Sequence, residues 1–510
     1  MEYFDARDFD LAGRIGRLKT GSGVIETPFL FPVVDPAKQT VSLEDIRSIG
    51  FNAIITNAYL MYSRMKGSVV DIHDFLKWRN PVMTDSGGYQ ILEYGDVDVD
   101  EDTIIEYQKR IGSDICVILD IPTGTHTART QAEKYVFETI RRGWRALPRI
   151  MDSKQLWVLP VQGAPFKDLL EYSATISARL PYHIYSLGSP TVFLEKYSYD
   201  KIIEYTFITR SKLPYNKPLH VFGVGHPMII PFLVAIGADT FDSASYILYA
   251  RDGRFMFEWG TRSLNELFYL PCSCPVCSRF SVEELKEMNS RERIPLIAKH
   301  NLYVLSSEIR RVKQSIKEGR LWEYLEYRSK AHPSLKRAFN TVKKYVNYIS
   351  RFCSLSQPLS LAILFLDRDS IHNPRIVATR MAVAENISRE RVSRAILIPA
   401  IEKPFDQQRI LRDVSSEYPG YRVLMYNPYL GLFPPELSST YPYYQHETGL
   451  FEINTSVVEE TVMTLLRMGV EEVVLVLPDD KVFRDFALNI SRVLVDRGIK
   501  ITIRESSSHV

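Results

Sequence analysis

The stretch VMTDSGGYQ (residues 82–90) is a short apolar run that leads directly into a carboxylate and a pair of glycines. Its apolar part is continuous rather than alternating, which is typical of a parallel strand buried on both faces. Similar runs recur through the first half of the chain, and amphipathic stretches with helical spacing separate them. The predicted strands span residues 28–34, 53–58, 82–86, 116–121, 157–162, 183–188, 219–225 and 240–244.

This rhythm predicts the fold class. Eight strand–helix units in about 250 residues are typical of a (β/α)8 barrel, also called a TIM barrel. An open, doubly wound sheet is the alternative, because a sequence alone does not show whether the sheet closes. We therefore expect an α/β protein whose residues 1–305 form a catalytic barrel.

Polar residues stand at the carboxyl ends of the predicted strands. They are Asp85, Asp120 and Asp242, together with Gln162 and Gly188. In a barrel these ends meet at one rim, where such enzymes carry their active sites. A single aspartate after a strand is more often a turn former or helix cap. Several aspartates with an amide and glycines indicate a site for a planar, hydrogen-bonding ligand such as a nucleobase.

Two carboxylates in one site also suit a double displacement at a sugar carbon. One carboxylate attacks the anomeric carbon and the other transfers protons. A serine or cysteine nucleophile is disfavoured, because the chain has no G-x-S-x-G turn and most of its cysteines lie in one cluster.

That cluster is Cys272, Cys274 and Cys277, and His300 follows it. The spacing predicts one structural zinc ion per chain, bound by these four ligands in a subdomain at about residues 265–305. A reduced cysteine cluster without metal is the alternative. The remaining Cys116 and Cys353 stand in apolar surroundings and are predicted to be buried thiols rather than a disulfide.

Composition bounds the remaining possibilities. Hydrophobic residues make up 45% of the chain and charged residues 24%, as in an ordinary soluble globular protein. We find no signal peptide and no run of membrane-spanning length, so we expect a cytoplasmic protein with no membrane contact. Between Glu308 and Arg351, however, Lys and Arg far outnumber Glu. Such a stretch is either a solvated helix face or a contact for a phosphate backbone.

The second half of the chain continues with a different pattern. Residues 306–357 are predicted to be the basic helical segment. Residues 358–438 and 439–510 are predicted to be two small α/β modules, because short apolar strands alternate with helical segments there.

Four motifs together resemble the tRNA-guanine transglycosylases over roughly residues 10–305. They are the stretch from Thr84 to Gln90, Val161-Gln162-Gly163, Phe241-Asp242-Ser243 and the cysteine–histidine set. The turn at residues 222–225, the stretch at 119–123 and the long C-terminal extension resemble the archaeal members. The resemblance implies replacement of guanine 15 in the tRNA D-loop by 7-cyano-7-deazaguanine (preQ0), the archaeosine precursor. It also implies a covalent aspartyl–tRNA intermediate.

The resemblance also implies roles for individual residues. Asp242 matches the nucleophile and Asp85 the general acid and base, although these roles have been assigned in either order in the family. Asp120 and Gln162 match base-reading positions. The remaining substrate-binding positions are Gly188, Tyr89 and Ser86, where Tyr89 offers a stacking face. The zinc matches the family's structural site.

Partners follow from the same resemblance: tRNA, guanine, 7-cyano-7-deazaguanine and a second copy of the chain, with dimerisation around the zinc region. Archaeal members usually continue into a PUA domain that grips tRNA, whereas this sequence stops at residue 510 after the last predicted strand. We therefore expect the basic segment, or a separate PUA-domain protein, to supply that grip. The alternatives are a non-catalytic tRNA-binding subunit and a paralogue resembling archaeosine synthase. The presence of both Asp85 and Asp242 favours the enzyme.

Overall fold

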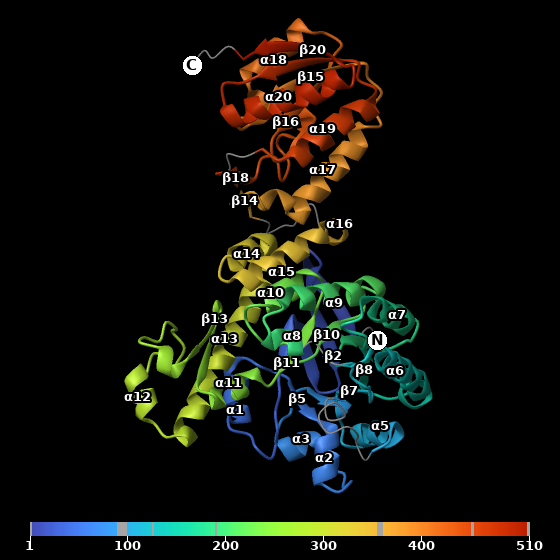
Figure 1. Cartoon of the computed structure of the whole chain (residues 1–510), viewed down its shortest axis with the longest axis vertical. Helices are drawn as coiled ribbons and strands as arrows, with labels where there is room; N and C mark the ends of the chain where they lie inside the picture. The colour runs from blue at the N-terminus through green and yellow to red at the C-terminus, as the bar shows by residue number, and fades with distance from the viewer. Residues whose placement is uncertain are drawn as a thin grey trace. The chain divides into compact units, whose positions relative to one another are not determined.

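The computed structural model describes residues 3–88, 99–124, 127–188, 191–353, 361–449 and 453–506. The chain forms two compact units (Figure 1). The first consists of Met1–Lys317 and Tyr327–Lys344, and the second consists of Glu318–Glu326 and Tyr345–Val510.

A closed barrel of eight parallel strands forms the core of the first unit. The strands are β4 (Phe29–Pro32), β5 (Ile54–Asn57), β6 (Val82–Asp85), β7 (Ile115–Val117), β8 (Leu156–Val161), β9 (Ile184–Leu187), β10 (Leu219–Val221) and β11 (Thr240–Ser243). Their order is β4-β11-β10-β9-β8-β7-β6-β5. A parallel bridge between Val33 and Ile55 joins the two ends of this order, and Val34 N donates to Ile55 O at 2.8 Å. The predicted barrel is therefore confirmed, and the open sheet is wrong.

Helices follow the strands and cover the outside of the barrel (Figure 1). They are α1 (Leu43–Ile49), α2 (Ala58–Arg64), α3 (Ile72–Leu76), α5 (Glu101–Arg110), α6 (Arg129–Ile150), α7 (Lys167–Ser177), α8 (Thr191–Glu195), α9 (Tyr199–Lys212), α10 (Ile230–Ala235) and α11 (Ser245–Arg251). Each predicted strand overlaps one barrel strand, but the observed strands are shorter where the chain turns early into a polar loop. Strand β7, for example, ends at Val117, before Asp120.

The amino-terminal end of the barrel is closed by an antiparallel sheet. Its strands are β1 (Phe4–Asp10), β2 (Gly13–Thr20) and β3 (Gly23–Thr27). From this sheet Arg14 donates to Asp239 through Nε at 2.7 Å and through Nη2 at 2.9 Å, and both side chains are buried. Asp239 directly precedes β11, so this two-bond contact helps to set the position of the strand that carries Asp242.

A hairpin and two helices complete the surroundings of the cysteine cluster. They are β12 (Arg254–Phe257), β13 (Gly260–Ser263), α12 (Val282–Glu287) and the long α13 (Ser290–Glu318). The basic stretch is helical, and α14 (Leu321–Ser329), α15 (Pro333–Lys344) and α16 (Val346–Ile349) follow α13.

Part of the basic stretch is paired within the first unit. Arg328 Nη1 lies 2.5 Å from Glu308 Oε1, and both side chains are buried. Lys313 pairs with Glu26 at 2.9 Å and Lys317 with Asp8 at 2.7 Å. These cations are therefore already engaged in ion pairs, whereas Arg310, Arg337 and Lys344 lie exposed.

The second unit has a five-stranded sheet in the order β17 (Gly431–Phe433), β16 (Arg422–Asn427), β15 (Arg394–Pro399), β19 (Glu472–Leu477) and β20 (Lys500–Glu505). Helices α17 (Pro374–Ile387), α18 (Arg409–Glu417), α19 (Thr455–Met468) and α20 (Lys481–Asp496) accompany it, and β14 (Ile363–Phe365) pairs with β18 (His446–Thr448). Strands from residues 358–438 and from residues 439–510 pair in this one sheet. Among the described residues, no helix combines the length and the apolar character needed to cross a membrane.

His73 links α3 to the amino-terminal end of the barrel. Its Nδ1 lies 2.8 Å from Trp78 O and its Nε2 lies 3.3 Å from Asp114 Oδ2. Both ring nitrogens face acceptors, so the doubly protonated ring satisfies the contacts best. The hydrogen bond to Asp114 raises the pKa of His73, against the effect of burial. Burial alone would raise the pKa of Asp114, but bonds from His73, Val82 and Ser22 lower it.

We expect His73→Gln to destabilise the protein by about 1–3 kcal/mol at pH 6 and by less at pH 9. The pKa of His73 is higher in the folded protein than in the unfolded chain. The resulting stability is fully present when the pH lies below the pKa of the unfolded chain, and it is lost as the pH rises through the pKa of the folded protein. Urea unfolding of wild type and variant at both pH values measures the difference. Equal destabilisation at pH 6 and pH 9 would show that His73 carries no charge in the folded protein.

Candidate active site and metal centre

Asp85 is the last residue of β6, and its carboxylate faces Asn57 at the end of β5. Asn57 Nδ2 donates to Asp85 Oδ2 at 2.9 Å. Asn57 Oδ1 accepts the N–H of Leu60 as the N-cap of α2, which determines which end of the amide points at Asp85. The start of a barrel helix therefore orients the donor to this carboxylate.

The surroundings of Asp85 favour its protonated form. Burial and the negative charges of Asp120 and Asp242 raise the pKa of Asp85 to about 7. Backbone N–H groups of Gly87 and Ser86 oppose this shift without cancelling it. A carboxyl group with a pKa near 7 can both donate and accept a proton at neutral pH.

Asp120 and Gln162 form a buried pair at the ends of β7 and β8. Gln162 Nε2 donates to Asp120 Oδ2 at 2.5 Å, and Gln162 Oε1 lies 3.4 Å from the N–H of Thr123. Burial raises the pKa of Asp120 to about 6, while Gln162 and the charge of Arg142 act in the opposite direction. Asp120 is therefore largely ionised at neutral pH and offers an acceptor edge.

Two glycines make room for this pair. A Cβ atom at Gly188 would lie 2.0 Å from Gln162 Nε2, and one at Gly88 would lie 2.3 Å from Asp120 Oδ1. Either atom would displace the polar side chain that it meets. Gly188 is one of the predicted substrate-binding positions, and the structure adds that the space left by its missing side chain is occupied by Gln162.

Asp242 lies in β11, and its Oδ1 atom accepts two hydrogen bonds. Gly223 N donates to it at 2.7 Å, and His220 Nε2 lies 3.1 Å away. Asp242 is buried. Two N–H groups around one oxygen stabilise the ionised carboxylate and define its orientation.

The two other predicted substrate-binding residues differ in what can be described. Ser86 is buried, and its hydroxyl donates to Ile118 O at 2.9 Å, which ties β6 to the end of β7. Tyr89 lies outside the described residues.

Asn57 and His220 were not singled out from the sequence, although both lie on predicted strands. Asn57 ends the run at 53–58 as Asp85 ends the next one, and this parallel was the available signal. His220 lies inside its strand rather than at the end, so only the register with Thr240 reveals its contact with the site.

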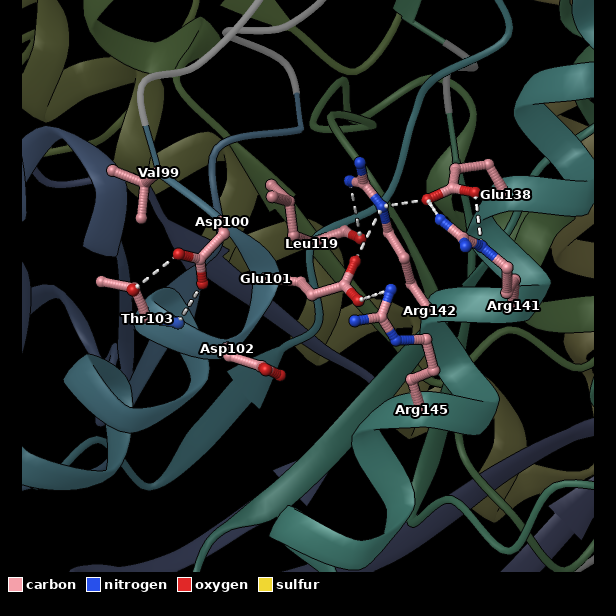
Figure 2. Close-up of a pocket in the computed structure, with 10 residues that line it drawn as sticks. All are labelled: Val99, Asp100, Glu101, Asp102, Thr103, Leu119, Glu138, Arg141, Arg142 and Arg145. Carbon is pink, nitrogen blue, oxygen red and sulfur yellow. Dashed lines mark hydrogen bonds and ion pairs between the residues drawn. The ribbon is translucent and has the colours of Figure 1, made fainter.

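A charged cleft of about 510 Å³ lies behind the Asp120 loop, between the start of α5 and the middle of α6 (Figure 2). Asp85, Asp120 and Asp242 are not among the residues that line this cleft. Figure 2 shows Arg142 reaching from α6 toward Leu119, whose carbonyl oxygen lies 3.4 Å from Nη1. Glu101 and Glu138 hold the same guanidinium at 3.2 and 3.0 Å. Arg142, which lines the cleft, therefore fixes the position of Leu119, the residue before Asp120.

Cys272, Cys274, Cys277 and His300 converge as the spacing predicted. Their ligand atoms lie within 4.8 Å of one another, so the group is able to hold a metal ion. His300 Nε2 lies 2.8 Å from Met256 O, which places the ring proton there and turns the Nδ1 lone pair toward Cys277 Sγ at 3.2 Å. Such a backbone acceptor is the usual partner of a metal-bound histidine.

The next residue anchors the helix that carries His300. Asn301 accepts Met256 N at 2.8 Å and donates to Tyr246 O at 3.1 Å. The cysteine loop is therefore joined through α13 to β12 and α11, directly after the barrel strand that carries Asp242.

The sequence of the chain matches one protein family and several relatives. The family model described as queuine tRNA-ribosyltransferase matches residues 9–334. A relative from Aeropyrum pernix named tRNA-guanine(15) transglycosylase is 46% identical over 449 residues, which cover 86% of each chain. Relatives with the same name from Pyrobaculum aerophilum and Sulfolobus acidocaldarius are 44% and 41% identical; the alignments cover 86% and 87% of this chain and 88% of each relative.

We expect Cys277→Ser to lower the metal content from about one ion per chain toward zero, because a tetrahedral site loses one of its four ligands. The thermal midpoint should fall by about 4 °C or more, since the ion stabilises only the folded state. Elemental analysis and calorimetry measure both effects. Cys353→Ser, which changes a cysteine outside the cluster, is the control. Unchanged metal content in Cys277→Ser would rule out this residue as a ligand.

Proposed function

Because the chain belongs to the tRNA-guanine transglycosylase family, we propose that it replaces guanine 15 of tRNA by 7-cyano-7-deazaguanine through a covalent aspartyl–tRNA intermediate. Family membership itself makes the protein a tRNA-modifying transferase that exchanges guanine. The finer proposal is carried by one observation. Asp85 and Asp242 lie at the same end of the barrel and are close enough for their charges to interact. Burial and neighbouring charges favour the protonated form of Asp85, whereas two N–H groups favour the ionised form of Asp242.

This difference supports one assignment of roles, which the sequence left open. Asp242 Oδ2 attacks C1′ of the nucleotide, and the bond between C1′ and N9 of guanine breaks. Asp85 gives its proton to the departing guanine. The product is a glycosyl ester between Asp242 and the tRNA.

The second half of the reaction reverses these steps with a different base. The incoming 7-cyano-7-deazaguanine loses its N9 proton to Asp85, and N9 attacks C1′ while Asp242 leaves. One glycosidic bond is broken and an equivalent one is formed, so no ATP or redox cofactor is required. Two displacements at one carbon retain its configuration.

The base-reading roles follow from donor and acceptor chemistry. The ionised Asp120 accepts N–H groups of the purine edge. Gln162, which contacts Asp120 and Thr123 and has room because Gly188 lacks a side chain, offers its amide beside it. Ser86 holds the floor of this region through Ile118. Tyr89 stacks on the base, as aromatic side chains commonly do with extruded bases.

The remaining features suit a structural metal, a dimer and an RNA surface. Three thiols and one imidazole match zinc, which the cluster would bind without an open position for substrate. Phe268 and Tyr269 are 81% and 84% exposed beside the cluster and would form the contact in a homodimer. Arg310, Arg337 and Lys344 would meet tRNA phosphates, or a separate PUA-domain protein would supply that grip.

We expect Asp242→Ala and Asp85→Ala each to lower exchange of labelled guanine into tRNA by at least about 100-fold. Only Asp242→Ala should also abolish a trapped protein–tRNA adduct, because Asp242 forms the covalent bond. Mapping the exchanged position with guanine and with 7-cyano-7-deazaguanine identifies site and substrate, and tRNA with adenine at position 15 is the control. An adduct that survives in Asp242→Ala but not in Asp85→Ala would reverse the two roles.

We expect Arg142→Gln to weaken base binding severalfold and to move the acidic limb of the pH profile to higher pH. Asp120 must be ionised to accept N–H groups, and loss of a nearby positive charge raises the pKa of a carboxyl group. Measurements of kcat/KM for the base between pH 5 and pH 8 test this shift. Arg141→Gln is the matched control, because Arg141 lines the same cleft and also pairs with Glu138, whereas Arg142 in addition donates to Leu119 O and lowers the pKa of Asp120. An identical shift in both variants would contradict a specific effect of Arg142.

A further inference from the structure

His220 is placed between two neighbouring strands so that each ring nitrogen meets one oxygen of β11. Nε2 lies 3.1 Å from Asp242 Oδ1, and Nδ1 lies 3.0 Å from Thr240 Oγ1. His220 is 1% exposed and Thr240 is 2% exposed. The ring of Phe222 packs against the imidazole with centroids 4.5 Å apart. Water therefore has little access to the histidine, and within the part of the chain that the structure describes its hydrogen bonds go to the side chains of Asp242 and Thr240.

The chemistry of the two oxygens differs, and this difference determines where the ring proton lies. An ionised carboxylate oxygen only accepts hydrogen bonds, so Nε2 must carry a proton to bind Asp242. A threonine hydroxyl can donate, so Thr240 can satisfy Nδ1 without a proton on that nitrogen. In the opposite tautomer a lone pair of Nε2 would face Asp242 Oδ1, which is repulsive.

The same carboxylate is held on one side only. Oδ1 accepts from His220 and from Gly223 N, and no hydrogen bond to Oδ2 is found among the described residues. We propose that His220 is a positioning residue for Asp242 and that Thr240 sets its tautomer, so that Oδ1 is anchored and Oδ2 is presented to C1′ of the nucleotide. This inference rests on the proposed role of Asp242 as nucleophile.

The arrangement would act in both halves of the exchange. When Oδ2 bonds to C1′, Oδ1 becomes the carbonyl oxygen of the glycosyl ester and keeps its two N–H donors. When Asp242 leaves again, the same donors receive the returning negative charge. The Nε2–H group of His220 donates a hydrogen bond to Oδ1 and does not remove the negative charge that the Asp242 carboxylate needs to attack C1′.

Thr240→Val tests the inference, because it removes the hydroxyl at nearly constant volume, and Thr240→Ser is the matched control that keeps the hydroxyl. We expect Thr240→Val to lower kcat for guanine exchange by about tenfold with KM for tRNA unchanged, since only an interaction of the reacting state is lost. Thr240→Ser should retain most of kcat. His183→Gln, which changes a partly buried histidine that accepts Trp157 N elsewhere in the barrel, should leave kcat unchanged.

A double-mutant cycle separates positioning from a purely structural role. In His220→Gln the amide NH2 group can donate to Oδ1 whatever its other neighbours are, because its protons do not move between two positions as those of an imidazole do. A further Thr240→Val change should therefore no longer lower kcat. Additive losses that follow the thermal midpoint of each variant would mean that the pair only stabilises the barrel, and the inference would be wrong.

The failure of this inference can be told apart from failure of the proposed function. If wild type exchanges guanine and Thr240→Val keeps full kcat, the inference fails while the function stands. If wild type exchanges no base, the function fails, and nitrogen-15 NMR of the histidines still reports the tautomer. A proton on Nδ1 rather than Nε2 of His220 would overturn the inference, whereas an Nε2 proton that depends on the Thr240 hydroxyl would support it.

Discussion

The bridge that joins Val33, directly after β4, to Ile55 of β5 is the constraint on which the site depends. In the sheet order, β11 and β6 lie far apart along the open ladder, with four strands between them. The bridge from Val33 to Ile55 closes the ladder, and only β4 and β5 then separate the strand of Asp242 from that of Asp85. Closure therefore brings together carboxylates that repel one another, and the charges of Asp120 and Asp242 contribute to the raised pKa of Asp85.

The barrel mouth shows how three identical side chains acquire different properties. Asp85 accepts from Asn57 and from the backbone N–H groups of Ser86 and Gly87, but burial and two like charges outweigh these bonds and raise its pKa. Asp242 has two N–H donors on a single oxygen. Asp120 is held by Gln162 and anchored from behind through Leu119. Environment rather than residue type therefore makes the three carboxyl groups differ, and the proposed roles of acid, nucleophile and acceptor rest on this difference.

Buried ion pairs outside the active site help to fix the positions of helices and strands in the first unit. Arg14 with Asp239 and Arg328 with Glu308 are buried pairs, and removing one partner of such a pair would leave an uncompensated charge. Arg328 of the basic stretch is in a buried pair, and Lys313 and Lys317 are in more exposed ion pairs, so the local excess of positive charge is not all available to a nucleic acid. Local charge counts in a sequence overstate an RNA-binding surface for this reason.

The sequence by itself determined the barrel strands, the aspartates that follow them and the cysteine–histidine set. These features are written in contiguous patterns: apolar runs, the residue after each run, and close cysteine spacing. Only the tertiary structure decided that the sheet closes and that Gly188 makes room for Gln162. It alone also placed Asn57 in contact with Asp85 and His220 in contact with Asp242. Each of these depends on strand register and chain closure between residues distant in sequence, which no local pattern encodes.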